Sequence, residues 1–171
     1  MENNVDKLID IAEHGLKINQ SKGVAAMEYS EIKAVKLFCD GLLSSPDWRE
    51  VVQNVLDGED DFEVDNVRFI ADSVIDEIQT EEIGDDEYAL GCFNSRFLSD
   101  ILDIDQDVIE AMQEAEAFEA IGKLIKSLGR LGDLQAAYSN EDGYGHYFNS
   151  YDGGEEEITI NGTLYHVFDN H

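Results

Sequence analysis

The sequence predicts a single α+β domain over residues 1–171, with helices in residues 1–140 and an antiparallel β-hairpin or three-stranded meander in residues 141–171. Apolar residues recur at spacings of three and four through most of the first part, which is typical of amphipathic helices. Near the C-terminus, two runs of β-branched and aromatic residues are joined by Asn161-Gly162, a pair that favours a type I′ turn. Hydrophobic residues make up 43% of the chain, with 8 Phe, 7 Tyr and one Trp, which is enough to bury the core of one domain.

Three helices are expected before the middle of the chain. Apolar stripes at helical spacing predict helices in residues 5–16 and in about 25–43. Ser45 and Pro46 then favour the start of a third helix, because serine caps helix N-termini and proline is tolerated in the first turn. Gly58 is a suitable stop for that helix.

The middle of the chain is predicted to begin with an acidic loop and to continue as helices. Residues 58–66 (GEDDFEVDN) form the loop, and Asp65 is the expected N-cap of a helix over residues 67–80. Asn94 and Asp105 are the expected N-caps of two further helices, of which the second is the longest in the chain. The Asn94 helix is expected at residues 94–102, and the Asp105 helix runs to Gly129. Two more helices are expected at residues 86–92 and 131–138.

The C-terminal strands are predicted at residues 157–160 and 163–168, on either side of the Asn161-Gly162 turn. Residues 144–151 (YGHYFNSY) are a candidate third strand. An isolated two-stranded hairpin is marginally stable in water, so these strands must pack on the helices or on a partner chain.

The net charge of −28 excludes several classes of function. The chain has 39 Asp and Glu against 11 Lys and Arg, whereas a nucleic-acid-binding surface needs an excess of basic residues. Anionic membranes would be repelled for the same reason. The field of such a protein attracts basic partners and cations.

No addressing signal is expected in this chain. Residues 1–20 are amphipathic and acidic, unlike a secretory leader, and no apolar run approaches the length of a membrane span. Cys39 and Cys92 both lie in apolar surroundings without a partner at motif spacing, and we expect reduced, buried thiols. These features predict a cytoplasmic location.

The charge is uneven along the sequence. Residues 51–120 contain 22 acidic and only 2 basic residues, compared with 9 and 6 in residues 1–50 and with 8 and 3 in residues 121–171. Adaptation to high salt would spread acidic residues over the whole surface, so this clustering argues against it.

Two interpretations of the acidic segment remain open. Glu77 and Glu81 are four residues apart, and Asp107, Glu110 and Glu114 follow a helical spacing, so neighbouring carboxylates repel each other. The simpler interpretation is a solvated acidic face. The functional one is mimicry of duplex DNA, whose charge density carboxylates on helices can approach. The candidate partner-binding residues are Glu59, Asp60, Asp61, Glu63, Asp72, Asp76, Glu77, Glu81, Asp85, Asp86, Asp103, Asp107, Glu110 and Glu114.

Metal binding and catalysis have little support in the sequence. Asp103, Asp105, Asp107 and Glu114 match four positions of a calcium loop, but Val108 occupies the position that should be glycine, and helix capping by Asp105 explains the cluster better. The histidines share no metal-ligand spacing, and His166 is expected to be a half-buried residue of a strand. Catalytic motifs are absent. We therefore predict no enzyme activity, no cofactor and no metal ligand.

Tyrosines are concentrated near the C-terminus. They are more often part of a sheet core than of a contact surface, but tyrosine is also favoured at interfaces. A homodimer or effector contact is the hypothesis that follows, with Tyr144, Tyr147, Tyr151 and Tyr165 as the candidate assembly surface.

A small, strongly acidic, mostly helical chain without catalytic motifs resembles the phage and mobile-element proteins that imitate DNA, such as anti-CRISPR and anti-restriction inhibitors. The resemblance lies in the size, charge and helical character of residues 51–120, and it assigns no individual residue. It implies an inhibitor that occupies the basic, DNA-binding or PAM-reading channel of a nuclease or CRISPR effector in the host cytoplasm. The alternative is an acidic adaptor or immunity-type protein that binds a basic protein away from any nucleic-acid site.

Overall fold

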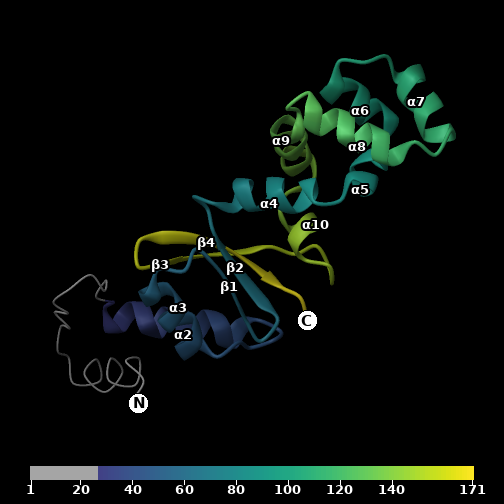
Figure 1. The fold of residues 1–171 in the computed structure, drawn as a ribbon. Coiled ribbons are helices and arrows are strands. Elements are labelled where there is room, and N and C mark those ends of the chain that lie inside the picture. Colours follow the sequence, from purple (N-terminus) through teal and green to yellow (C-terminus); the bar gives the residue numbers. More distant parts are fainter. Residues whose placement is uncertain (1–26) are drawn as a thin grey trace. The chain divides into compact units, whose positions relative to one another are not determined.

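The computed structural model describes residues 27–171, which divide into two compact units. The sheet unit comprises residues 27–74 and 144–171, and the helical unit comprises residues 75–143 (Figure 1). The α+β class is confirmed. The prediction of one domain stays a prediction, and the helix predicted at residues 5–16 lies outside the described part of the chain.

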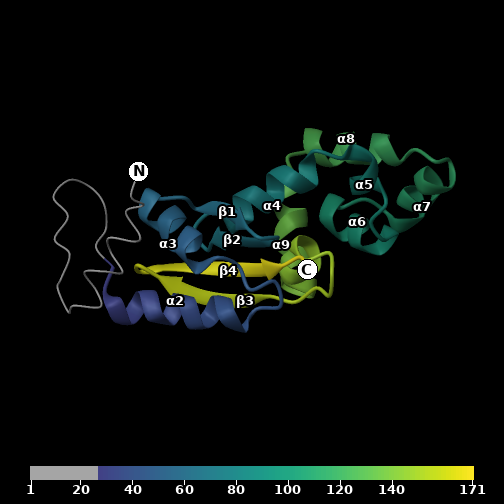
Figure 2. The same cartoon turned by 90° about the horizontal axis from the view of Figure 1, so that it is seen from below.

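The sheet unit contains a four-stranded antiparallel sheet with the strand order β1-β2-β4-β3. In chain order, its elements are α2 (Tyr29–Gly41), α3 (Trp48–Asp57), β1 (Asp61–Val64), β2 (Val67–Ala71), α10 (Gly145–Phe148), β3 (Glu156–Ile160) and β4 (Thr163–Asp169). Two hairpins that are far apart in the sequence meet along β2 and β4. Helices α2 and α3 cover one face of the sheet (Figures 1 and 2). Helix α10 lies on the other face (Figure 1).

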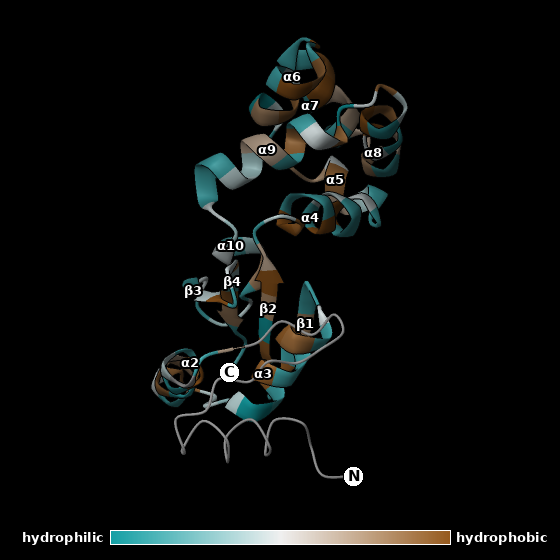
Figure 3. Cartoon of the chain, turned by 90° about the vertical axis from the view of Figure 1, so that its left-hand side faces the viewer, coloured by the Kyte–Doolittle hydropathy of each residue, from teal (hydrophilic) through white to brown (hydrophobic). Residues whose placement is uncertain are grey.

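The two central strands of the sheet are buried on both faces. Successive side chains of a strand point to opposite faces. Phe69 and Val167 therefore pack with Val35 and Val51 under α2 and α3, while Phe168 faces α10. Most of β2 is hydrophobic for this reason (Figure 3).

The C-terminal hairpin is confirmed. Strands β3 and β4 pair with Ile160 opposite Thr163, and the two residues between them have φ values of 52° at Asn161 and 82° at Gly162. Positive φ at both central positions is the requirement of a type I′ turn.

The prediction of an acidic loop followed by a helix over residues 67–80 is wrong. Residues 61–64 and 67–71 form the hairpin β1–β2, and Asp65 and Asn66 are its turn, with φ values of 50° and 65°. Aspartate and asparagine tolerate this left-handed conformation better than most residues. The apolar residues of β2 satisfy a helical spacing by coincidence, whereas the run VRFIA also has the composition of a strand.

The prediction of a third strand at residues 144–151 is also wrong. Residues 144–151 form the short helix α10 and a turn, and β3 is an edge strand of the sheet in the part of the chain that the structure describes. Glycine makes this packing feasible, because a Cβ on Gly145 would lie 2.2 Å from the carbonyl oxygen of Gly153.

The helical unit consists of six short helices. They are α4 (Ile75–Gly84), α5 (Glu87–Gly91), α6 (Ser95–Leu102), α7 (Gln106–Glu114), α8 (Phe118–Ser127) and α9 (Leu131–Asp142). The two N-caps predicted in this unit are confirmed, since the side chains of Asn94 and Asp105 accept hydrogen bonds from the backbone N–H groups of Arg96 and Asp107. In the sheet unit the predicted cap Ser45 is wrong, because Asp47 caps α3 by accepting a hydrogen bond from the N–H of Arg49. None of the described helices is long and apolar enough to cross a membrane.

The longest predicted helix, from the Asp105 cap to Gly129, is in fact two helices. The chain breaks between α7 and α8, where Glu116 has a φ of 56°. Ile109 is fully buried, whereas the neighbouring Val108 is 50% exposed.

Two glycines allow α5 and α8 to cross in close contact. A Cβ on Gly91 would lie 2.1 Å from the backbone oxygen of Phe118, and a Cβ on Gly122 would lie 2.1 Å from that of Glu87. Any larger residue at either position would force the two backbones apart.

Helices α4 and α9 share a buried polar network. The side-chain amide of Gln135 donates to the Asp76 carboxylate at 2.8 Å and to the Gln79 carbonyl at 2.8 Å. Both glutamines are buried, and Ser139 also hydrogen-bonds Gln79. Asp76 is therefore part of the internal structure of this unit as well as of its surface.

Candidate functional site

All 14 predicted partner-binding carboxylates are exposed, but they are divided between the two units. Glu59, Asp60, Asp61, Glu63 and Asp72 belong to the sheet unit, and the other nine belong to the helical unit. The acidic excess is nearly equal in the two units. Acidic and basic residues number 17 and 4 in residues 27–74 and 144–171, and 18 and 4 in residues 75–143. The concentration in residues 51–120 is thus a feature of the sequence window rather than of one unit.

Three of the four basic residues of the helical unit pair with carboxylates outside the predicted set. Lys126 and Lys123 lie 3.3 and 3.9 Å from Glu87, and Arg130 lies 2.8 Å from Asp133. Glu77 and Glu81 of α4 and Asp107 and Glu114 of α7 have no basic partner among the described residues.

Some of the predicted carboxylates have structural partners. Asp61 forms a two-point ion pair with Arg68 at 2.7 and 2.8 Å, Asp86 caps α5, and Glu110 accepts hydrogen bonds from Ser95 and Gln106. Six others in the helical unit form no side-chain hydrogen bond or ion pair with the described residues, and we call them the open carboxylates. They are Glu77, Glu81, Asp85, Asp103, Asp107 and Glu114.

A second cluster surrounds His166 in the sheet unit. His166 lies on the central strand β4, directly opposite Glu157 of β3 in the strand register. Glu155 precedes Glu157 by two residues and therefore points to the same face of the sheet. On the other side of β4, Ile70 of β2 lies opposite His166, and Asp72, two residues after Ile70, also points to this face. The sheet register therefore brings three carboxylates to one imidazole.

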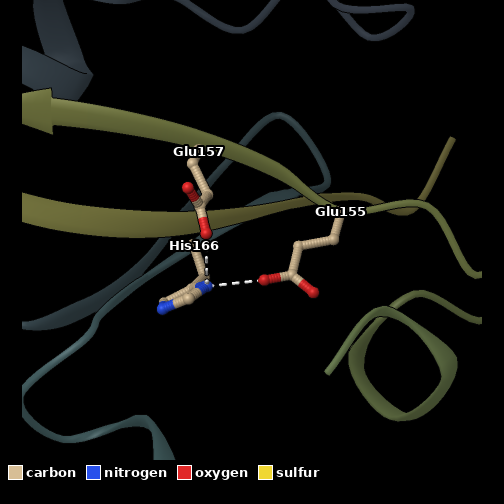
Figure 4. Close-up of side chains that lie close together, drawn as sticks. All are labelled: Glu155, Glu157 and His166. Carbon is tan, nitrogen blue, oxygen red and sulfur yellow. Dashed lines mark hydrogen bonds and ion pairs between the residues drawn. The ribbon is translucent and has the colours of Figure 1, made fainter. Parts of the chain in front are cut away.

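The imidazole is held between carboxylates on both sides of the ring. Nδ1 lies 2.6 Å from Glu155 Oε1 and 3.8 Å from Glu157 Oε1, and both glutamates approach this nitrogen in Figure 4. Nε2 points away from them and lies 3.1 Å from Asp72 Oδ1. The His166 side chain is 6% exposed, whereas Glu157 and Asp72 are 58% and 62% exposed.

The cluster changes the protonation of the histidine. Burial lowers the pKa of His166, but hydrogen bonds to Asp72 and Glu155 and the charges of these carboxylates outweigh burial and raise the pKa above its ordinary value. The ring of Tyr144 packs edge-on against the imidazole, with 5.1 Å between the ring centroids.

A tight turn before β3 positions Glu155. The buried Asn149 side chain donates to Asp152 at 2.9 Å and to the carbonyl oxygen of Gly154 at 2.8 Å, and it accepts from the N–H of Tyr151 at 3.0 Å. This turn determines where the chain enters β3, and so where the Glu155 carboxylate lies.

Sequence reasoning missed this cluster. It found no metal-ligand spacing among the histidines, because the four residues lie on three separate segments. One signal was available, since a two-residue turn at Asn161-Gly162 places Glu157 opposite His166. The contribution of Asp72 could not be found, because residues 67–80 were expected to be helical. The expectation that His166 lies on a strand is confirmed, but the residue is buried rather than half-buried, at 5% exposed.

The candidate assembly surface needs a correction at Tyr165. This residue is 2% exposed, and its hydroxyl donates to the carbonyl oxygen of Glu59 at 3.0 Å, so it belongs to the core. Tyr144 and Tyr147 are half-buried, and Tyr151 is 58% exposed. Assembly through the remaining tyrosines stays a prediction.

The cysteine prediction is confirmed for Cys39 and wrong for Cys92. Cys39 is fully buried, and burial, together with the charges of Asp40 and Asp47, raises its pKa to about 12. Cys92 follows the last residue of α5 and is exposed.

Comparisons with protein-family models, with curated proteins and with solved structures found no match to this chain.

Proposed function

We propose that this protein binds a basic protein by mimicking duplex DNA, and that its target is a nucleic-acid-targeting nuclease or CRISPR effector. The observation that carries the proposal is the set of open carboxylates on α4, α7 and their flanking turns. Within the helical unit, 18 acidic residues stand against 4 basic ones, and three of those four bases pair with Glu87 and Asp133.

Electrostatics supports this function over a generic solvated surface. Neighbouring carboxylates on one helix repel each other, and a sequence selected only for stability would intersperse lysines among them. A groove lined with lysine and arginine would gain from neutralising these carboxylates, as it gains from neutralising DNA phosphates. The same charges would accelerate association.

Charge reversal of open carboxylates tests the proposal. Glu77→Lys, Glu81→Lys and Glu114→Lys are combined, because these side chains have no structural partner among the described residues. Asp72, Asp76 and Glu110 are left unchanged, since reversing them would also break hydrogen bonds. The matched control combines Glu28→Lys, Glu50→Lys and Glu156→Lys, which changes the net charge equally on exposed residues of the sheet unit.

The immobilised protein is incubated with a bacterial lysate that contains restriction and CRISPR nucleases, with and without excess duplex DNA. Captured proteins are identified, and DNA cleavage by the captured nuclease is then assayed with each variant over a range of salt concentrations. We expect the wild type and the control to inhibit cleavage, with inhibition weakening steeply as salt increases, and the helical-unit variant to lose inhibition.

Two results contradict the proposal. Inhibition that survives in the helical-unit variant would show that the open carboxylates do not bind the target. A complex that survives excess duplex DNA would instead support the adaptor or immunity-type function, because such a partner is bound away from its nucleic-acid site.

A further inference from the structure

The His166 cluster has an arrangement of groups that the proposed function does not explain. Three carboxylates surround a single imidazole, and none of them forms an ion pair with a lysine or arginine among residues 27–171. A protonated histidine supplies one positive charge to three negative ones, so the cluster retains a negative charge on a largely buried ring.

We propose that His166, Glu155 and Glu157 bind a divalent transition-metal ion, with Asp72 as the positioning residue that orients the imidazole. One atom from each of the three ligands, His166 Nδ1 and a carboxylate oxygen of each glutamate, lies within 4.8 Å of the other two. A divalent ion would supply the charge that the cluster lacks.

The ligand spacing fits a metal after a small movement. Ligand atoms about 2.1 Å from a zinc-like ion lie about 3.0 Å apart at a right angle and about 3.4 Å apart at a tetrahedral angle. The distances from Nδ1 to the two glutamate oxygens, 2.6 and 3.8 Å, fall on either side of these values. Shifts of less than about 1 Å in two side chains would satisfy both ligand bonds.

Asp72 has the position of an outer-shell carboxylate. A metal-ligating histidine usually donates its second ring N–H to a carboxylate, which fixes the tautomer and the ring orientation. Here Nε2 lies 3.1 Å from Asp72 Oδ1, on the side of the ring away from the glutamates. The ring is therefore held with Nδ1 directed toward the two prospective ligands.

The donor set indicates the class of metal. Imidazole favours zinc and other first-row transition metals over calcium and magnesium, which prefer oxygen ligands alone. Three protein ligands leave one or more positions for water, and the 58% exposure of Glu157 gives the ion a route from solvent.

Calorimetric titration of Zn²⁺ into the full chain tests the site, with excess Mg²⁺ present to occupy weak acidic surface sites. We expect one saturable Zn²⁺ per chain, with Kd raised at least about tenfold by His166→Gln or Glu157→Gln. Asp72→Asn is expected to raise Kd by about 10- to 100-fold, which is typical of outer-shell substitutions.

Two matched controls are available, one beside the site and one at the C-terminus. Glu156→Gln removes the same charge from the adjacent residue, whose side chain points to the other face of the sheet, and His171→Gln removes an exposed histidine. Both controls are expected to bind Zn²⁺ as the wild type does. Absorption of bound Co²⁺ in the visible range provides a second readout, which Glu157→Gln is expected to abolish and Glu156→Gln to retain.

Glu157→Gln is the decisive variant if His166→Gln does not fold, because Glu157 is mostly exposed and, among residues 27–171, forms only one ion pair, at 3.8 Å. The absence of saturable Zn²⁺ binding in the wild type would overturn the proposal. Zn²⁺ binding that Glu157→Gln leaves unchanged would overturn it as well. Neither result bears on nuclease inhibition, which is measured with residues of the helical unit.

Discussion

The two cysteines of this chain differ sharply in their surroundings. Cys39 is fully buried in the core of the sheet unit, and its pKa is raised to about 12, whereas Cys92 is exposed at the end of α5. The thiolate is the reactive form of cysteine. At neutral pH, we expect a maleimide or a disulfide reagent to modify one thiol per native chain and two per unfolded chain. The reaction is followed by mass spectrometry, with Cys92→Ser as the control that should leave the native protein unlabelled. Rapid labelling of Cys39 in the native protein would contradict the buried placement.

At the same scale, His166 shows what local sequence can indicate. Its burial on a strand follows from its alternation with Leu164 and Phe168, and its cross-strand neighbour Glu157 follows from the length of the Asn161-Gly162 turn. Its third carboxylate, Asp72, comes from a segment 94 residues away in the sequence. No local pattern specifies that β2 pairs with β4.

At the scale of the elements, the crossing of α5 and α8 depends on glycine. Gly122→Ala would place a methyl group against the backbone oxygen of Glu87, so we expect a loss of about 1–3 kcal/mol or more in the free energy of unfolding. Gly132→Ala in α9 is the control, since a Cβ there meets nothing within 4 Å and alanine favours helix by up to about 1 kcal/mol. Denaturant unfolding followed by circular dichroism measures both. Equal stability of the two variants would show that the helices do not cross at these glycines.

The elements also show why some sequence predictions failed. The run VRFIA fits both a helical stripe and a strand, and the hairpin β1–β2 is decided by the turn at Asp65-Asn66 and by pairing with β4. The break between α7 and α8 contains no proline or glycine that would mark it in the sequence. The residue that adopts the left-handed conformation there is Glu116. In both cases, long-range packing decides between local alternatives of similar energy.

At the scale of the whole molecule, the dominant property is a net charge of −28 carried almost equally by the two units. Self-repulsion of like charges destabilises a compact state, and salt screens it. We therefore expect Tm to rise as NaCl is increased from about 10 mM to about 500 mM, the range over which the screening length falls below about 5 Å. Each triple lysine variant described above should raise Tm at low salt and reduce its dependence on salt. Differential scanning calorimetry makes the comparison, and a Tm that does not change with salt would contradict it.

The sequence by itself determined the α+β class, the C-terminal hairpin, the caps of α6 and α7, and the acidic character of the surface. These properties depend on residues close together in the chain or on composition alone. The tertiary structure decided that two hairpins join into one sheet and that Asp72, Glu155 and Glu157 meet at His166. It also divided the acidic residues between two units. The physical reason is that strand pairing between distant segments is stabilised by the packing of the whole sheet, which no short stretch of sequence encodes.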